Sequence, residues 1–298
     1  MTMDAARKAK IWKRTQVGGG LAGALVLLLW LASFSFGPLL VLSLAAVLSV
    51  AGAWELARMG VPHRGATLWG MVLMTAAAIV WLLRSGLGGA LPLQSGDLAW
   101  ILWCLLPLPM LISAAAYGRA AHGPTREGHG IHGLFAAVWV SVPLLLLYPV
   151  RLLGGVSALA ALMVLSKIGD IAGYYAGNFF GKSHPVPRLS PGKTTAGCVG
   201  SFAAGTLAGL LLQAGGTLPG APQAGLPWLW AGALAGALIN IAAQAGDLYE
   251  SYWKRRTGVK DSGTWFGPSG GVLDLVDSLL FTAPVAAITW PALFGWSA

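Results

Sequence analysis

The chain has 298 residues, of which 56% are hydrophobic and only 10% are charged, and its mean hydropathy is +0.70. Soluble domains carry about 25% charged residues, so this composition excludes a water-soluble fold, and it also excludes a disordered, nucleic-acid-binding or disulfide-stapled protein. The composition therefore predicts an integral membrane protein, whose net charge of +9 must be concentrated somewhere along the chain.

The chain begins with a basic tail at residues 1–16, which we expect to lie in the cytoplasm against anionic headgroups. Nine apolar runs follow, at 17–34, 37–54, 67–83, 98–117, 131–149, 152–167, 197–214, 226–246 and 272–294. These runs lack the polar–apolar alternation of barrel strands, and most approach the length of about 20 residues that a spanning helix needs. We predict an all-α, polytopic integral membrane protein with about nine transmembrane helices. The sixth helix is expected to continue toward Phe180.

The basic residues indicate the orientation. When the spans alternate from a cytoplasmic N-terminus, 17 of the 19 lysines and arginines fall on the cytoplasmic side, and only Arg84 and Arg151 do not. We therefore predict a multi-pass protein of the cell's inner (cytoplasmic) membrane with its active site facing the cytoplasm. Residues 17–150 would form N-terminal transmembrane helices, and residues 151–298 a C-terminal catalytic region.

The first chemically informative segment follows the sixth run. Asp170, Tyr174, Gly177 and Gly181 recur at helical spacing, so one helix face carries a carboxylate, a hydroxyl and two positions of close backbone approach. The Ser-Pro-Gly-Lys-Thr turn at 190–194 offers hydroxyls, backbone N–H groups and an ammonium to an anion. By itself this turn is equally well explained as a basic loop that touches lipid headgroups.

The second chemically informative segment extends from the end of the eighth apolar run to the start of the ninth. A polar stripe that includes Asn240 and Gln244 ends in Asp247, and Asp274 and Asp277 lie three residues apart at the start of the last run. Carboxylates on two helices beside clustered basic residues suit a magnesium–phosphate site. Ion pairs that tie helix ends together are the alternative, but carboxylates inside apolar helices are costly and favour a functional role.

These residues together resemble the signature of the phosphatidate cytidylyltransferases, also called CDP-diacylglycerol synthases. The C-terminal part of the match comprises Asp247, Glu250, Ser251, Lys254, Arg255, Lys260, Asp261, Phe266, Gly267, Gly270, Gly271, Asp274 and Asp277. The earlier part comprises Asp170, Tyr174, Gly177, Gly181, Lys182, Ser190, Pro191, Lys193, Thr194 and Gly197, and Trp54-Glu55 is similar to a weaker family feature.

The resemblance implies transfer of a cytidylyl group from CTP to phosphatidic acid, with Mg²⁺ and room for a second cation. It implies Asp247, Asp274 and Asp277 as metal ligands, and Asp247, Asp274, Lys254, Lys260 and Asp261 as the catalytic set. Its substrate-binding residues would be Ser190, Lys193, Thr194, Arg255, Asp170, Tyr174, Gly270 and Gly271. It also implies a homodimer, on which the sequence itself is silent.

Three positions depart from the family pattern. Ser269 stands in place of a histidine, Leu275 in place of an arginine, and Thr195-Ala196 in place of a Trp-Glu pair. These departures leave open a divergent paralogue that acts on another lipid phosphate, or a non-catalytic membrane protein that binds lipid or nucleotide. A transporter is disfavoured because the polar groups gather on one side of the predicted bilayer.

Overall fold

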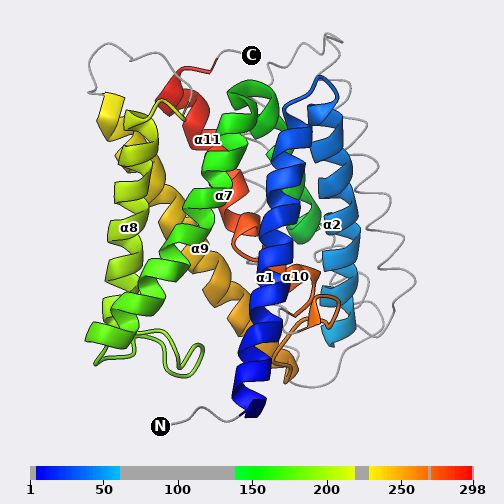
Figure 1. The fold of residues 1–298 in the computed structure, drawn as a ribbon, viewed down its shortest axis with the longest axis vertical. Coiled ribbons are helices and arrows are strands. Elements are labelled where there is room, and N and C mark those ends of the chain that lie inside the picture. The colour runs from blue at the N-terminus through cyan, green and yellow to red at the C-terminus, as the bar shows by residue number, and fades with distance from the viewer. Residues whose placement is uncertain (1–4, 61–137, 219–227, 268–269, 297–298) are drawn as a thin grey trace, which may run out of the picture.

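The computed structural model describes residues 5–60, 138–218, 228–267 and 270–296, and the regular elements in these ranges are helices. The described helices are α1 (Ala5–Ala32), α2 (Gly37–Gly60), α7 (Leu147–Phe180), α8 (Thr195–Ala214), α9 (Trp228–Thr257), α10 (Val272–Val276) and α11 (Leu279–Phe294). The long helices run roughly along one direction as a bundle, with α9 and α11 crossing behind α7 (Figure 1). The predicted all-α class is confirmed for these ranges.

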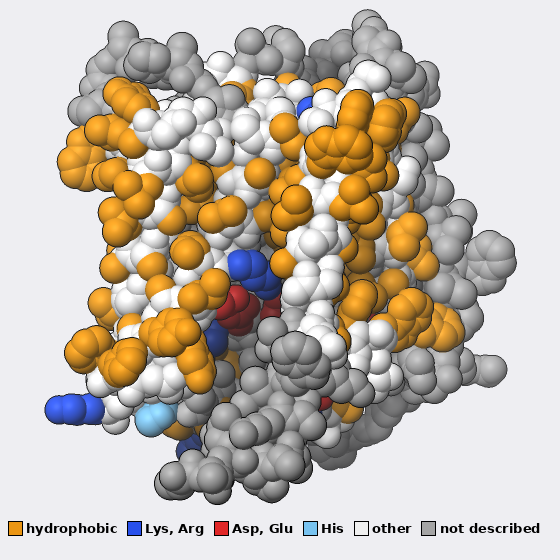
Figure 2. All heavy atoms as spheres, viewed as in Figure 1, with side chains coloured by type: hydrophobic (Ala, Val, Ile, Leu, Met, Phe, Trp, Pro, Cys, Tyr) orange, Lys and Arg blue, Asp and Glu red, His pale blue; other side chains and the backbone are white. Residues whose placement is uncertain are grey.

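Five described stretches are long and apolar enough to cross a membrane. They are Gly37–Leu56, Val138–Phe180, Thr195–Ala214, Trp228–Arg255 and Val272–Phe294, and α1 adds a shorter apolar stretch at Gln16–Ala32. Hydrophobic side chains also cover much of the outer surface of the bundle (Figure 2). Apolar surface that faces outward is what a bilayer accepts and water does not, so the chain is a helical membrane protein.

The helical stretch from residue 138 to Phe180 makes two passes rather than one. Its helix is interrupted at Gly155, where φ is 75° and ψ is −177°, a conformation that glycine adopts without a Cβ penalty. The ribbon rises to the top of the view and then turns down into the long α7 helix (Figure 1). At this end Arg151 donates to the carbonyl oxygen of Ala32, with Nε and Nη2 at 2.8 and 2.6 Å. The interruption at Gly155 lies inside the run predicted at 152–167, slightly after the boundary expected between 149 and 152, and α7 reaches Phe180 as expected.

Other boundaries differ from the prediction. The helix predicted at 226–246 runs on to Thr257, because its last turns are polar on one side yet still bury residues such as Glu250 and Trp253. The last predicted helix is interrupted between α10 and α11 at Asp277 and Ser278. The spans predicted at 67–83 and 98–117, and the first part of 131–149, lie outside the described residues.

Glycines let α7, α8 and α9 pack with their backbones close together. A Cβ placed on Gly173 would lie 3.0 Å from the carbonyl oxygen of Gly197 on α8. A Cβ on Gly209 of α8 would collide with the backbones of Gly232 and Gly236 on α9. Small residues at such spacing are the usual means of close helix packing within membranes, where burial of apolar surface supplies little driving force. These three helices therefore form one closely packed unit.

A buried carboxylate joins α2 to the distant helix α10. The Glu55 side chain is only 2% exposed, and its oxygens accept hydrogen bonds from the backbone N–H groups of Val272 and Leu273 at 2.9 and 2.8 Å. The hydroxyl of Ser262 donates to the same carboxylate at 2.9 Å. The first N–H groups of a helix have no partner within the helix and carry partial positive charge, so an anion stabilises them. Glu55 thus fixes where α10 begins.

We predict that Gly209→Ala lowers the free energy of unfolding by about 2 kcal/mol, because the new methyl group forces α8 away from α9. The thermal unfolding midpoint of the detergent-solubilised protein measures this effect. Gly23→Ala is the matched control, because a Cβ at that helical glycine would meet no atom within 4 Å. Equal midpoints for the two variants would contradict the close packing described here.

We further predict that Glu55→Gln lowers the free energy of unfolding by about 2–3 kcal/mol, because an amide NH₂ would face backbone N–H donors that need an acceptor. The same thermal measurement applies. Ser49→Ala on the same helix is the control, since the buried Ser49 hydroxyl bonds only locally to the Ala45 carbonyl oxygen at 2.6 Å among the described contacts. A Glu55→Gln variant as stable as Ser49→Ala would show that this carboxylate does not hold α10.

Candidate active site

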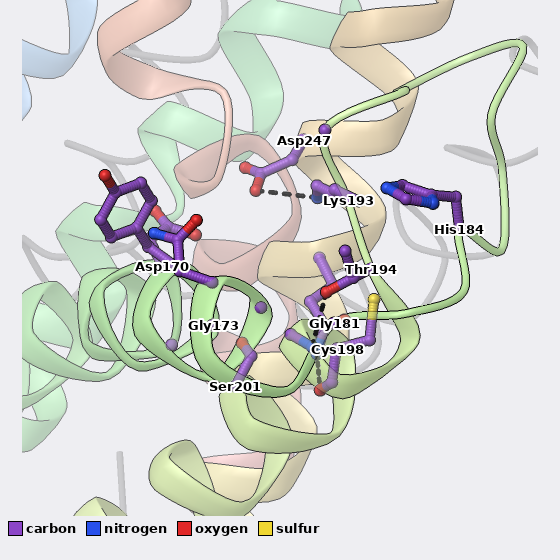
Figure 3. Close-up of a pocket in the computed structure, with 16 residues that line it drawn as sticks. Asp170, Gly173, Gly181, His184, Lys193, Thr194, Cys198, Ser201 and Asp247 are labelled. Atoms are coloured by element: carbon purple, nitrogen blue, oxygen red, sulfur yellow. Dashed lines mark hydrogen bonds and ion pairs between the residues drawn. The ribbon is translucent and has the colours of Figure 1, made fainter.

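A cavity of about 450 Å³ lies between the second half of α7, the start of α8, the middle of α9 and the loop at 181–194 (Figure 3). Its lining combines glycines with polar and charged side chains. The lining residues are Gly169, Asp170, Gly173, Tyr174, Gly177, Asn178, Gly181, His184, Gly192, Lys193, Thr194, Gly197, Cys198, Ser201, Gln244 and Asp247. Five residues of the predicted site therefore meet here, namely Asp170, Tyr174, Lys193, Thr194 and Asp247.

An ion pair crosses the mouth of this cavity. Lys193 Nζ lies 3.1 Å from Asp247 Oδ2, and both side chains remain partly exposed. Asp170 lies on another side of the same cavity, and Figure 3 shows its carboxyl group and that of Asp247 flanking one space. Asp170 interacts electrostatically with Lys193, Asp247 and Asp277. Asp170 also interacts with Lys167, so three carboxylates from α7, α9 and the α10–α11 junction lie near two ammonium groups, those of Lys193 and Lys167.

The loop that carries Lys193 is held by short hydrogen bonds. Thr194 is the N-cap of α8, where its hydroxyl accepts from the Gly197 N–H at 3.1 Å. Thr195, one of the departures from the family pattern, donates its N–H to the Ser183 carbonyl oxygen at 2.9 Å, and the two hydroxyls are 2.8 Å apart. The backbone of Ser190 accepts from the Lys193 N–H at 3.2 Å, which closes the turn. These bonds position Lys193 over the cavity.

The inner wall of the cavity is a ladder of uncharged polar groups. Asn240 donates to Ser201 Oγ at 3.0 Å, and Gln244 donates to Asn240 Oδ1 at 2.6 Å. Gln244 also lies 3.3 Å from the Cys198 carbonyl oxygen. The side chains of Ser201, Asn240 and Gln244 thus have partners inside the bundle, as an apolar surrounding favours. The polar stripe predicted on this helix faces α8 and the cavity.

A second polar cluster lies where α9 meets the loop that joins it to α10, residues 258–271, here called the signature loop. Lys254 Nζ is 2.6 Å from Asp274 Oδ1 and 2.9 Å from Glu250 Oε2. Asp274 Oδ2 accepts from the Gly271 N–H at 2.7 Å and from both the N–H and the hydroxyl of Ser262 at 2.8 Å. The oxygens of Asp274 are therefore occupied by four protein donors. In this structure Asp274 organises the loop and the start of α10.

The predicted residues Gly270 and Gly271 belong to this second cluster. Gly270 has a φ of 84°, so the loop turns where other residues would be strained, and a Cβ there would collide with the Asp274 carboxylate. The buried Glu250 places its Oε1 without a hydrogen-bond partner among the described residues. The cluster thus joins α9 to α10 through one lysine and two acids.

Asp277 lies between the cavity and the outer surface. Its Oδ1 accepts from the Ser278 N–H at 2.6 Å and lies 3.6 Å from Lys167 Nζ. Asp277 does not line the cavity, but it interacts electrostatically with two residues that do, Asp170 and Asp247.

Nine residues of the predicted site do not line the cavity. Five of them have been described above: Lys254, Gly270, Gly271 and Asp274 in the second cluster, and Asp277. The other four are Arg255, Lys260, Asp261 and Ser190. Arg255, Lys260 and Asp261 have exposed side chains near the signature loop, and Ser190 serves in the turn before Lys193. Of the departures, Ser269 lies outside the described residues, and Leu275 is partly buried against the hydrophobic core.

Several residues of the site were absent from the predicted set. Glu55, Lys167 and Glu250 had a usable signal, since each is a charged residue in or beside an apolar run. Ser262 and Ser201 gave no such signal, because single serines are common in loops and membrane helices. Their roles arise from contacts between segments that are distant in the sequence.

The residues present fit a magnesium ion. Among the described residues no three His, Cys, Asp or Glu side chains form a ready-made metal cluster. Mg²⁺, however, is commonly held by one or two carboxylates, with substrate phosphates and water completing its octahedron. Asp247 and Asp170 offer two hard oxygen donors on one polar cavity, with Asp277 beside them.

The comparisons with known proteins agree on one family. The sequence profile of the Cytidylyltransferase family matches residues 12–292. A Pseudomonas aeruginosa protein named phosphatidate cytidylyltransferase is 36% identical over 267 residues, which cover 88% of this chain and 91% of the relative.

Two further relatives match a shorter part of the chain. A Mycobacterium leprae protein named phosphatidate cytidylyltransferase is 35% identical over 54% of this chain and 48% of its own length. The uncharacterized Escherichia coli protein YnbB is 38% identical over 52% of this chain, and the match spans about half (48%) of that relative. With a profile that matches nearly the whole chain and a relative similar over most of its length, this membrane protein belongs to the cytidylyltransferase family.

Proposed function

We propose that this protein transfers the cytidylyl group of CTP to phosphatidic acid, which yields CDP-diacylglycerol and pyrophosphate for phospholipid biosynthesis. The observation that carries the proposal is the cavity where Lys193, Asp247 and Asp170 meet within a bundle of membrane helices. In the reaction, an oxygen of the lipid phosphate attacks the α-phosphorus of CTP, and the bond to the pyrophosphate oxygen breaks. Such a transfer needs alignment and charge neutralisation more than covalent chemistry by the protein.

The side chains divide this work between them. Lys193 stands at the cavity mouth and would hold the phosphates of CTP, exchanging its bond to Asp247 for bonds to phosphate oxygens. Asp247, Asp170 and Asp277 would hold Mg²⁺, with Asp274 completing a site for a second cation if its loop bonds rearrange. The bound Mg²⁺ would polarise the phosphoryl oxygens and stabilise the departing pyrophosphate. Lys254 would keep the signature loop in position through Asp274.

We also propose nine spans, a cytoplasmic N-terminus and location in the inner membrane, with the cavity facing the cytoplasm. The N-terminal end and the loop at 181–194 lie toward one end of the bundle, whereas the C-terminus lies at the other (Figure 1). Termini at opposite ends favour an odd number of crossings. The basic tail and the site then share the side that the positive-inside rule assigns to the cytoplasm. A homodimer is proposed from the family resemblance alone.

The decisive experiment supplies the purified protein in phosphatidylcholine vesicles with labelled CTP and phosphatidic acid. We expect a labelled CDP-lipid and an equal amount of pyrophosphate. Parallel reactions with other lipid phosphates, and with other nucleoside triphosphates, test for a divergent paralogue. Binding of either substrate without any product would favour the non-catalytic alternative.

We predict that the transfer depends on a divalent cation. Removal of metal with EDTA should abolish product formation, because the repulsion between CTP phosphates, lipid phosphate and cavity carboxylates would go unscreened. Excess Mg²⁺ should restore the activity. Isothermal titration with Mg²⁺ and a non-hydrolysable CTP analogue gives an independent readout, since the analogue should bind at least tenfold more weakly without the metal. Full turnover in EDTA would refute the proposed metal role.

We predict that Asp247→Asn lowers kcat about a hundredfold, because the variant keeps the size of the side chain but loses the charge. Lys193→Gln should instead raise KM for CTP about tenfold, since a charge-assisted bond to phosphate is worth roughly 1.5–3 kcal/mol. Arg188→Gln is the control, because Arg188 is an exposed cation of the same loop that does not line the cavity. A control variant as impaired as Lys193→Gln would show that loop charge in general, rather than this lysine, binds CTP.

A further inference from the structure

Lys167 lies on an exposed face of α7 that carries apolar side chains together with Asp170 and Tyr174. Lys167 shares a face of α7 with Val164 and Ile171, which are 47% and 56% exposed, and its own side chain is 46% exposed. Exposed aromatic residues continue along α7 as far as Phe180. Apolar side chains therefore extend outward on both sides of Lys167, and its exposed side chain emerges between them.

Lys167 cannot reach the headgroup region by extending its side chain along the helix. Thirteen residues separate it from Phe180, and at about 1.5 Å per residue this distance is roughly 20 Å, far longer than a lysine side chain. The turn at Gly155 lies almost as far in the other direction. A charged group held at such a position is costly and is retained where it contacts a charged ligand or lines a polar path.

The ion pair made by Lys167 is loose in comparison with the others. Its Nζ lies 3.6 Å from Asp277 Oδ1, whereas the pairs of Lys193 and Lys254 measure between 2.6 and 3.1 Å. Asp277 is only 14% exposed and already accepts a hydrogen bond from the Ser278 N–H. Figure 2 shows basic and acidic side chains together in a hollow between the apolar surfaces of neighbouring helices. The ammonium is thus open on the side that faces the bilayer.

We propose that Lys167 receives the phosphate headgroup of the lipid substrate as it arrives sideways from the bilayer, with the acyl chains along the apolar face of α7. This inference rests on the proposed function, because it names the binding residue for one of the two substrates. A phosphomonoester can carry two negative charges, so it offers Lys167 a stronger partner than the distant Asp277 oxygen. A zwitterionic phospholipid offers a single phosphate charge that its own ammonium group balances.

The same arrangement separates the two substrates. CTP is soluble in water and reaches Lys193 through the loop side of the cavity, whereas the lipid phosphate reaches Lys167 from the apolar side. Asp170 lines the cavity, lies one helical turn after Lys167 and interacts electrostatically with it, so a phosphate on Lys167 would lie next to the cavity. Lys167 is therefore a specificity-determining residue for the lipid and has no direct part in CTP binding.

The test measures initial rates of Lys167→Gln in vesicles, with the mole fraction of phosphatidic acid and the concentration of CTP varied separately. We expect the apparent KM for phosphatidic acid to rise at least tenfold and the KM for CTP to change less than twofold. Lys167→Arg should recover most of the lipid affinity, and Arg188→Gln should change neither constant. Equal changes in both constants, or no change in either, would overturn the proposal.

A binding measurement keeps this test independent of turnover. Spin-labelled phosphatidic acid and spin-labelled phosphatidylcholine are compared for association with the intact protein in vesicles. The wild type should prefer phosphatidic acid, and Lys167→Gln should lose that preference even if no product forms with any nucleotide. Glycerol 3-phosphate should compete poorly because it lacks acyl chains. Competition as strong as that of the lipid, or an unchanged preference in Lys167→Gln, would refute a lipid-facing phosphate site.

Discussion

The buried carboxylate of Glu55 is the constraint on which the arrangement of the site depends. It accepts from two N–H groups at the start of α10 and from the hydroxyl of Ser262, so it ties the N-terminal helices to the signature loop. Ser262 in turn donates to Asp274, and Asp274 holds Lys254 of α9. Since α9 also carries Asp247, a continuous chain of charged and polar contacts runs from α2 to the cavity. Because these groups are buried or half-buried, each depends on its neighbour for hydrogen bonds.

Contacts at glycines are the second feature on which the arrangement of the helices depends. Helices α7, α8 and α9 approach closely because Gly173, Gly197 and Gly209 have no side chains at the contacts. The same absence of side chains leaves room for a cavity on the loop side of the contact, lined by backbone and by a few polar groups. The site is therefore a consequence of how the helices pack. A polar cavity can exist inside an apolar bundle because the ladder from Ser201 to Gln244 satisfies its own hydrogen bonds.

Much of this could be predicted from the sequence, and the rest could not for identifiable reasons. Hydropathy located the helices because a bilayer imposes length and apolarity on each span separately. Helical spacing placed Asp170 and Tyr174 on one face, and both line the cavity. Spacing could not show that Asp274 would be surrounded by protein donors, because those donors come from a loop whose path depends on Glu55. The sequence did predict that the helix continues past Lys167 toward Phe180, but spacing could not show that Lys167 pairs with Asp277 of a distant segment.

Near α10, a cation comes from a different helix than the one that carries it in the family signature. The family signature has an arginine directly after the position of Asp274, and here Leu275 occupies that position and packs against the core. Lys167 nevertheless brings a cation to Asp277 from α7. A cation next to Asp274 in the chain would be fixed to the signature loop, whereas a cation on α7 stands at the border between cavity and lipid. If Lys167 binds the lipid phosphate as proposed, the helix that carries the cation determines the side from which that phosphate approaches.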